Sequence, residues 1–282
     1  MNIAVIGANG QLGMDLMAAF ADEGPKGLTH DDIEITDRGS VARVLRELKP
    51  DLVINTAAYH KVEDCEKNPE RSLQVNSLGA HNLAVVTSSM NVDLLHISTD
   101  YVFDGKKRSP YLETDPTHPL NVYAVTKLAG EQFIAANASR YYVVRSSGLY
   151  GHNRCRAKGR NFIETMLALA KEKKEVRVVR DEVLTPTYTF HLAEQIRELV
   201  ATRAYGLYHV TNNGSCSWYE FACAIFDRAG VSVNITPTTV KEFASPVQRP
   251  HYSVLANSAL QALSLDRMPE WGESLGHYFK NI

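Results

Sequence analysis

The N-terminus of the chain carries the pattern that most restricts its fold, a short apolar run that passes directly into a glycine turn. Residues 2–6 read Asn-Ile-Ala-Val-Ile, glycines follow at positions 7, 10 and 13, and an apolar-rich stretch continues to Phe20. The run is typical of a buried strand, and the stretch after Gly13 is typical of a helix. Glycines in such a turn let the backbone approach a pyrophosphate, and the helix N-terminus favours its charge. The pattern predicts a dinucleotide site; a turn whose glycines serve packing alone is the alternative.

The strand signal recurs along the first half of the chain. Short apolar runs at residues 51–55, 94–98 and 141–145 are separated by helical stretches at about 72–90 and 122–137. Near-continuous apolar strands that alternate with helices are typical of a parallel sheet covered on both faces. We therefore expect an α/β fold with a Rossmann-type doubly wound parallel sheet.

The regular alternation ends near residue 150. A polar loop leads to a helix from 162 to about 171, a strand around 176–179, and a less regular tail that includes a helix at 218–229. We expect this part to form a smaller C-terminal α+β subdomain that binds the substrate. The expected division gives residues 1–150 and about 176–205 to the dinucleotide-binding part, and residues 151–175 and 206–282 to the smaller part.

Composition narrows the class of partner. The chain has 282 residues, 44% hydrophobic and 22% charged, with a formal net charge of -2, so it carries no field that would hold nucleic acid or an anionic membrane. No basic segment precedes the first strand and no apolar stretch is long enough to span a bilayer, so we expect a cytoplasmic protein. The four cysteines and ten histidines are scattered, which predicts neither a disulfide framework nor a bound metal.

Tyr123 and Lys127 lie four residues apart in a predicted helix, and residues at this spacing share one helical face. A nearby cation favours the phenolate form of a tyrosine and lowers its pKa, so that the phenol can exchange a proton more readily. Taken alone, the spacing occurs by chance on many surface helices. Thr99, at the end of an apolar run, adds a hydroxyl that could share the same site.

Short motifs in a fixed order extend these signals over almost the whole chain. They are Gly10-Gln-Leu-Gly13, Asn55-Thr-Ala-Ala58, Val62 followed by Glu66, Ser98-Thr-Asp-Tyr-Val-Phe103, Pro119-Leu-Asn-Val-Tyr123, Lys127-Leu-Ala-Gly-Glu131, Asn161-Phe162 and Arg249-Pro250. The glycine spacing and the later Tyr-x-x-x-Lys resemble the short-chain dehydrogenase/reductase superfamily. The full set resembles the dTDP-4-dehydrorhamnose reductase family within it.

This resemblance implies NAD(P)H-dependent reduction of the C4 keto group of a dTDP-linked 4-keto-6-deoxy sugar, giving dTDP-L-rhamnose from dTDP-4-dehydro-L-rhamnose. Tyr123 would give a proton to the carbonyl oxygen, Thr99 would polarise that oxygen, and Lys127 would lower the pKa of the tyrosine and bind the nicotinamide ribose. A nucleotide-sugar substrate and a monomer or homodimer are implied as well. The implied substrate contacts are Thr99, Asp100, Tyr123, Asn161 and Arg249. The implied cofactor contacts are Gly7, Gly10, Gln11, Leu12, Gly13, Glu34, Ile35, Ala57, Ala58, Tyr59, Tyr123 and Lys127.

The chain also departs from the family pattern. The acidic residue expected at the end of the second strand is missing near Thr29, and because a carboxylate there repels a 2′-phosphate, its absence favours NADPH or the use of either cofactor. Gly148 replaces a usual Trp, which is expected to leave space in the sugar pocket, Leu184 replaces a usual Gly, and Glu63 replaces a usual Asp. Some relatives hold a divalent cation at a subunit contact, but no ligand cluster in this sequence indicates one.

Two further features leave alternatives open. The loop at 152–160 contains Arg154, Arg156, Lys158 and Arg160, and it is either a clamp for a nucleotide diphosphate or a solvated loop. The same fold would also suit a nucleotide-sugar epimerase or dehydratase that keeps NAD bound and recycles it, or a non-catalytic NADP-binding regulatory subunit. The intact Thr99, Tyr123 and Lys127 favour an enzyme.

Overall fold

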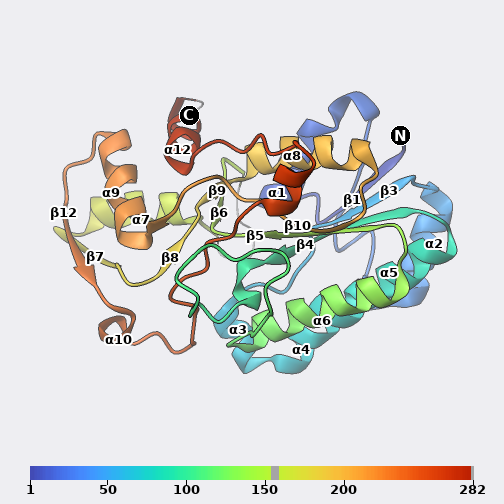
Figure 1. Ribbon diagram of the computed structural model, residues 1–282, viewed down its shortest axis with the longest axis horizontal. Helices are drawn as coiled ribbons and strands as arrows, with labels where there is room; N and C mark the ends of the chain where they lie inside the picture. The colour runs from blue at the N-terminus through green and yellow to red at the C-terminus, as the bar shows by residue number, and fades with distance from the viewer. Residues whose placement is uncertain (154–158, 281–282) are drawn as a thin grey trace.

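A central parallel sheet between two layers of helices dominates the computed structural model, which describes residues 1–153 and 159–280 (Figure 1). Within this part of the chain the sheet has six strands in the order β10-β5-β4-β3-β1-β2, and all neighbouring pairs are parallel. The strands are β1 (Ile3–Ile6), β2 (Lys26–Leu28), β3 (Leu52–Asn55), β4 (Asp93–Thr99), β5 (Tyr141–Ser146) and β10 (Gly206–His209). The chain leaves β1 toward β2 on one side and toward β3 on the other, which confirms the expected doubly wound α/β fold.

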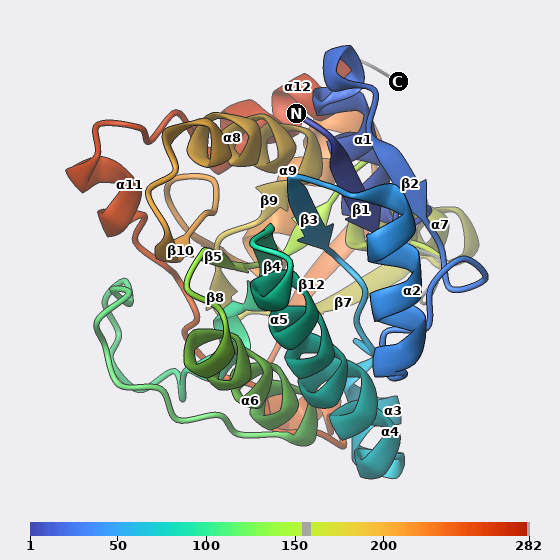
Figure 2. The same ribbon diagram turned by 90° about the vertical axis from the view of Figure 1, so that its right-hand side faces the viewer.

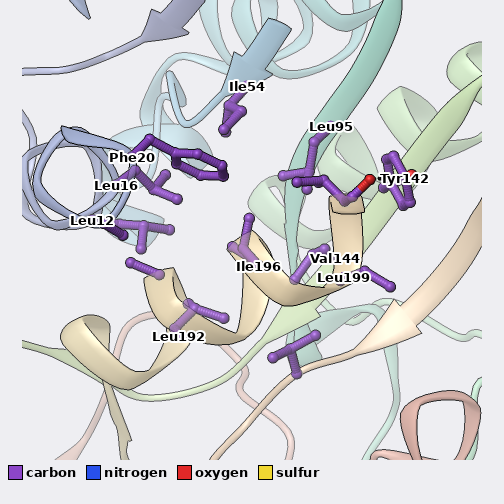
Figure 3. Packing of buried hydrophobic residues seen from close by; sticks show 14 of the residues in the cluster. Leu12, Leu16, Phe20, Ile54, Leu95, Tyr142, Val144, Leu192, Ile196 and Leu199 are labelled. Atoms are coloured by element: carbon purple, nitrogen blue, oxygen red, sulfur yellow. Dashed lines mark hydrogen bonds between the residues drawn. The ribbon is translucent and has the colours of Figure 1, made fainter. Parts of the chain in front are cut away.

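Helices bury both faces of this sheet, which explains why its strands are nearly continuous apolar runs. Leucines of α1 pack with Leu192 and Ile196 of α8 against Ile54 and Leu95 of the sheet (Figure 3). The opposite face is covered by α2, α5 and α6, as Figure 2 shows. The bounds of these helices are α1 (Gln11–Ala19), α2 (Arg38–Leu48), α5 (Gly79–Ser89), α6 (Val122–Asn137) and α8 (Thr189–Thr202).

Shorter helical segments lie between several of the strands and longer helices. The expected helix at about 72–90 consists of α4 (Pro69–Leu73), a π-helical segment (Gln74–Leu78) and α5, and α3 (Val62–Lys67) precedes it. Short 3-10 helices span Ala21–Glu23 and Asp100–Val102. At the start of α6 the side chain of Asn121 accepts a hydrogen bond of 2.9 Å from the backbone N–H of Ala124. This cap fixes where α6 begins, and therefore places Tyr123 in its first turn and Lys127 one turn later.

The smaller part of the molecule lies to the left in Figure 1 and has a core of its own. Its strands form three pairs: β7 (Glu175–Val179) with β12 (Asn234–Thr238), β8 (Val183–Leu184) with β11 (Cys216–Ser217), and β6 (Leu149–Tyr150) with β9 (Thr187–Tyr188). Its helices are α7 (Phe162–Glu172), α9 (Trp218–Ala229), α10 (Val240–Phe243) and α12 (Trp271–Lys280). A further short helix, α11 (Ser258–Ala262), packs beside β10 of the main sheet.

The structure places two strands in a different part of the molecule from the one that the sequence predicted. Strand β10, expected in the smaller part, forms the edge of the main sheet beside β5, with Leu207 paired to Val143. Strand β7, expected with the main sheet, pairs with β12 in the smaller part. A short apolar run shows that a strand exists but carries no information about which strand it pairs with, so the sequence could not assign either one. Among the described residues, no helix combines the length and apolar character needed to cross a membrane.

Candidate active site

A cavity of about 1110 Å³ lies at the carboxyl ends of the central strands and reaches into the smaller part of the molecule. Its wall includes every residue that the sequence predicted for the site. From the main sheet and its loops come Gly7, Gly10, Gln11, Leu12, Gly13, Glu34, Ile35, Ala57, Ala58, Tyr59, Thr99, Asp100, Tyr123 and Lys127, and from the smaller part come Asn161 and Arg249. The structure thus brings these residues together, while the role of each one stays a prediction.

The glycine turn closes one end of the cavity. Gly7 has a φ of +79°, in the region that favours glycine, and the N–H of Gly10 donates to the carbonyl of Gly7 at 2.9 Å. A Cβ at Gly13 would lie 2.2 Å from that same carbonyl oxygen, so the helix can approach the turn this closely only with glycine. No side chain caps the start of α1, which leaves the first N–H groups of the helix available to an anion.

Thr29 directly follows β2, so a neutral side chain stands where an acidic one was expected, and Thr29 lines the cavity together with His30. The nearby Glu34 carboxylate accepts hydrogen bonds from the backbone N–H and hydroxyl of Thr36, at 2.9 and 2.8 Å. Burial works against ionisation, but these hydrogen bonds hold the pKa of Glu34 below its usual value. The basic side chain of Arg71 lines the cavity as well.

Thr99, at the end of β4, and Tyr123 meet in the cavity wall. The Thr99 hydroxyl donates to the Asp100 carboxylate at 3.1 Å and accepts the backbone N–H of Tyr101 at 3.2 Å. Burial raises the pKa of the Tyr123 phenol, and hydrogen bonding with Thr99 acts in the opposite direction. The phenol therefore has a pKa above its usual value, whereas the Tyr-x-x-x-Lys spacing predicted a lowered one.

Lys127 points toward β4 and is almost fully buried, at 2% exposure. Its Nζ donates to the carbonyl of Ile97 at 2.6 Å and lies 3.0 Å from Nε2 of His96. Burial lowers the pKa of Lys127 to about 8, although the carboxylate of Glu131, one turn further along α6, acts in the opposite direction. Because these partners belong to β4, the lysine is held by the strand, which accounts for its small effect on the phenol.

The other three predicted substrate contacts, Asp100, Asn161 and Arg249, have different local roles. Asp100 is 3% exposed, accepts the hydroxyl of Ser147 at 2.8 Å, and has its pKa raised to about 6 by burial. The side-chain amide of Asn161 accepts the N–H of Glu164 and donates to the carbonyl of Gly151, so it caps α7 and connects the start of this helix to Gly151. Arg249 pairs with Glu63 and thereby links the C-terminal tail to α3.

The space expected beside Gly148 is filled. Gly148 has a φ of +55°, and a Cβ placed on it would lie 2.7 Å from Cδ1 of Leu184 and 3.1 Å from Cα of Pro186. Leu184 is 4% exposed and lines the cavity. Leu184 therefore occupies the volume directly beside Gly148, while the enlarged sugar pocket stays a prediction.

The sequence did not identify several residues that line the cavity, among them Glu182 and Trp218. Glu182 is 8% exposed and its pKa is raised by burial, with Arg249 and His251 acting in the opposite direction. Trp218 packs on Phe162 with ring centroids 4.5 Å apart and also lines the cavity. Glu182 belongs to an ordinary polar loop, so no local sequence signal could have identified it.

Part of the basic loop falls outside the structure. Arg154, Arg156 and Lys158 lie outside the described residues, so the expectation of a diphosphate clamp stays a prediction for them. Arg160 lines the cavity.

A doubly wound parallel sheet, a glycine turn at the first helix and a Tyr-x-x-x-Lys pair on one cavity define a protein of the short-chain dehydrogenase/reductase class. Comparison with known proteins narrows this class, because residues 1–282 match the family model described as RmlD substrate binding domain. The chain belongs to this family.

Several similar proteins match this chain over nearly its full length. The chain is 39% identical over 280 residues to spore coat polysaccharide biosynthesis protein SpsK of Bacillus subtilis, covering 99% of this chain and 96% of that protein. It is 35% identical over 294 residues to dTDP-4-dehydrorhamnose reductase of Burkholderia thailandensis, covering 98% and 97% of the two chains. The crystal structure of dTDP-4-dehydrorhamnose reductase from Bacillus anthracis in complex with NADP superposes with a TM-score of 0.96 at 38% identity, covering 100% of both chains.

Proposed function

We propose that the chain is an NADPH-dependent reductase that converts the 4-keto group of a dTDP-linked 4-keto-6-deoxy sugar to a hydroxyl, with dTDP-4-dehydro-L-rhamnose as substrate. One observation carries the proposal: Thr99, Tyr123 and Lys127 line the same cavity as the glycine turn. Relatives that share a third or more of the sequence are named as dTDP-4-dehydrorhamnose reductases.

The residues of the turn fit a dinucleotide. The close approach at Gly13 and the uncapped start of α1 leave backbone N–H groups for a pyrophosphate, which Gly10, Gln11 and Leu12 would bind. Thr29 itself is uncharged, although the carboxylate of Asp32 accepts hydrogen bonds from its backbone N–H and its hydroxyl, both at 2.8 Å. His30 and Arg71 line the cavity and offer basic partners for a 2′-phosphate. The relative from Bacillus anthracis was crystallised with NADP, which supports the same preference here.

The side chains around the reacting carbonyl have complementary tasks. NADPH, when bound, supplies a hydride to the carbonyl carbon. Tyr123 gives its proton to the oxygen, and its raised pKa keeps that proton in place until an alkoxide, a much stronger base, develops. Thr99 donates a hydrogen bond to the same oxygen. Lys127, whose pKa is lowered to about 8, can hold or release a proton near neutral pH and return it toward the tyrosinate.

Purified protein with NADPH and dTDP-4-dehydro-L-rhamnose should show oxidation of the nicotinamide, followed by its absorbance, in step with formation of the reduced sugar. We expect Tyr123→Phe to lower kcat by a factor of roughly 100 or more, since a positioned general acid contributes about that much. Tyr219→Phe is a matched control, because Tyr219 lies in α9 and outside the cavity wall.

The same assay separates the alternatives. An epimerase or dehydratase would convert the sugar with no net loss of NADPH, and it would purify with tightly bound NAD. A non-catalytic NADP-binding subunit would leave the absorbance flat across a panel of dTDP-linked 4-keto sugars. Either result would overturn the proposed reduction, whereas activity on a different 4-keto sugar would correct the substrate alone.

A further inference from the structure

Lys127 is the last member of a chain of buried polar groups that crosses from β3 to β4. Asn55 ends β3, and the register of the sheet places it beside His96 of β4. Nδ2 of Asn55 lies 2.9 Å from Nδ1 of His96, and Nε2 of His96 lies 3.0 Å from Nζ of Lys127. All three side chains are at most 2% exposed, so water cannot replace a poorly matched hydrogen bond among them.

The orientation of the Asn55 amide is fixed at the first link. Its Oδ1 accepts the backbone N–H of Ala57 at 3.1 Å. Rotating the amide by half a turn would set an NH2 group against that N–H, two donors facing one another in a buried site. The amide oxygen therefore stays on Ala57, and the NH2 group faces Nδ1 of His96.

The amide in turn fixes the tautomer of His96. A donor facing Nδ1 requires an unprotonated nitrogen there, so the neutral ring carries its proton on Nε2. The doubly protonated ring is disfavoured, because burial and the neighbouring lysine both lower the pKa of His96 far below its usual value. The Nε2–H group then points at Nζ of Lys127.

We propose that His96 is a positioning residue that donates a hydrogen bond from Nε2–H to Lys127, with its tautomer held by Asn55, and so favours the neutral amine of the lysine over the ammonium. The amine can accept this bond with its lone pair while one of its own N–H groups donates to the carbonyl of Ile97 at 2.6 Å. An ammonium has three donors and no acceptor, so it would face Nε2–H donor to donor. Of the two forms, only the amine avoids this contact between two donors.

Other charged and titratable groups around Lys127 come from several elements. The carboxylate of Glu131 favours the ammonium, but it is paired with the guanidinium of Arg145 on β5 at 2.7 Å. Further titratable groups nearby include Tyr123 on α6, Tyr101 and Asp100 after β4, and Cys65 on α3, which acts on Tyr123. Burial and the His96 donor therefore both favour the amine of Lys127, whereas the carboxylate that favours the ammonium, Glu131, is already paired with a cation.

The consequence for turnover rests on the proposed reduction. After Tyr123 gives its proton to the substrate oxygen, the tyrosinate must regain one. With a pKa of about 8, Lys127 still carries a proton in part of the molecules near neutral pH, and a lysine in this form can return the proton and become an amine. No other bond changes in this proton transfer. A donor from His96 stabilises the amine that results, so the return of the proton to Tyr123 becomes more favourable.

The tautomer can be read directly from the whole protein. Nitrogen NMR of histidine-labelled protein distinguishes a protonated ring nitrogen from an unprotonated one, and the His96 signals are those lost in His96→Gln. We expect a protonated Nε2 and an unprotonated Nδ1 between pH 6 and pH 9. A protonated Nδ1, on a neutral or a charged ring, would overturn the proposal.

Asn55→Asp tests the direction of the coupling. A carboxylate at position 55 can accept from both Ala57 and His96, so the proton of the ring should move to Nδ1 and Nε2 should become an acceptor for the ammonium. The titration of Lys127, followed through its side-chain signals, should then move to higher pH by roughly one unit or more, and the pH profile of kcat should move with it. Asn257→Asp is the matched control, since Asn257 is equally buried but binds Thr211.

An unchanged tautomer and lysine titration in Asn55→Asp would contradict the proposal. The wild-type measurement stands even if the variant does not fold. Both NMR readouts need no substrate, so a chain that lacks reductase activity but shows protonated Nε2 would refute the proposed function and leave the hydrogen-bond chain intact.

Discussion

The ion pair of Glu131 and Arg145 lies beneath the site and carries the sharpest prediction about stability. The two side chains are 5% and 4% exposed, and Oε2 of Glu131 lies 2.7 Å from Nη2 of Arg145, while Oε1 lies 3.0 Å from Nε. The hydroxyl of Ser98 also donates to Glu131. The guanidinium otherwise faces the ring of Phe103 and the ring of His209, which is neutral because burial lowers its pKa to about 3.

Glu131→Gln keeps the shape of the side chain and removes its charge. The guanidinium of Arg145 would remain buried without a counter-charge, and breaking one side of a buried pair costs about 3–5 kcal/mol. The glutamine oxygen still accepts one hydrogen bond from Arg145, so we expect the lower end, about 3 kcal/mol. For a chain of this size each kcal/mol lowers Tm by roughly 2–4 °C, which predicts a fall of about 6–12 °C.

Urea unfolding and a thermal scan measure the loss. Glu23→Gln is the matched control, because it makes the same change in a pair with Arg197 that is 3.3 Å apart and has side chains 25% and 37% exposed. We expect this control to lose less than about 1 kcal/mol. If Glu131→Gln loses no more stability than Glu23→Gln, the guanidinium does not need its buried counter-charge and the reasoning is refuted.

Three further predictions follow from local contacts. Gly13→Ala would bring a Cβ within 2.2 Å of the carbonyl oxygen of Gly7, so this variant should lose NADPH binding in a fluorescence titration. Gly272→Ala is the control, because a Cβ at Gly272 meets open space, and this variant should still bind NADPH. Equal binding by the two variants would contradict the prediction. Burial raises the pKa of Asp100 to about 6, so the folded state retains a proton that the unfolded chain releases, and stability falls by roughly 3 kcal/mol as the pH rises from about 4 to 6. Asp100→Asn should remove that part of the pH dependence of unfolding, and an unchanged slope would exclude it. The hydroxyl of Tyr150 is buried with no hydrogen-bond partner among the described residues, so Tyr150→Phe should raise the free energy of unfolding by about 1 kcal/mol, and a loss in urea unfolding would show that the hydroxyl has a partner.

Features with a local signal could be predicted from the sequence. Gly13 follows a strand and opens a helix, and both elements are visible in the spacing of apolar residues. Tyr123 and Lys127 belong to one helix, so their shared face follows from helical geometry alone. For these residues the sequence already predicts the local arrangement, and the structure adds the distances and the burial.

Features that depend on register could not be predicted in this way. Asn55 and His96 are 41 residues apart, and they meet because β3 and β4 pair in parallel with these two residues opposite one another. The same limit explains β7 and β10, whose short apolar runs join sheets that the sequence did not assign to them. The hydrogen-bond partner of a buried polar side chain therefore depends on how the strands pair in the folded protein. The hydrogen bonds and charges around Lys127 depend on the same pairing.

Gly148 and Leu184 show how two separate departures from a family pattern can form one packing unit. The φ of +55° at Gly148 favours glycine, and the methyl group of Leu184 occupies the position that a larger residue at 148 would need. A bulky side chain at 148 would therefore require both a smaller residue at 184 and a different backbone conformation. Because Leu184 and Gly148 line the cavity together, the wall here is aliphatic. The two changes thus alter the surface against which a sugar packs while leaving the volume beside Gly148 filled.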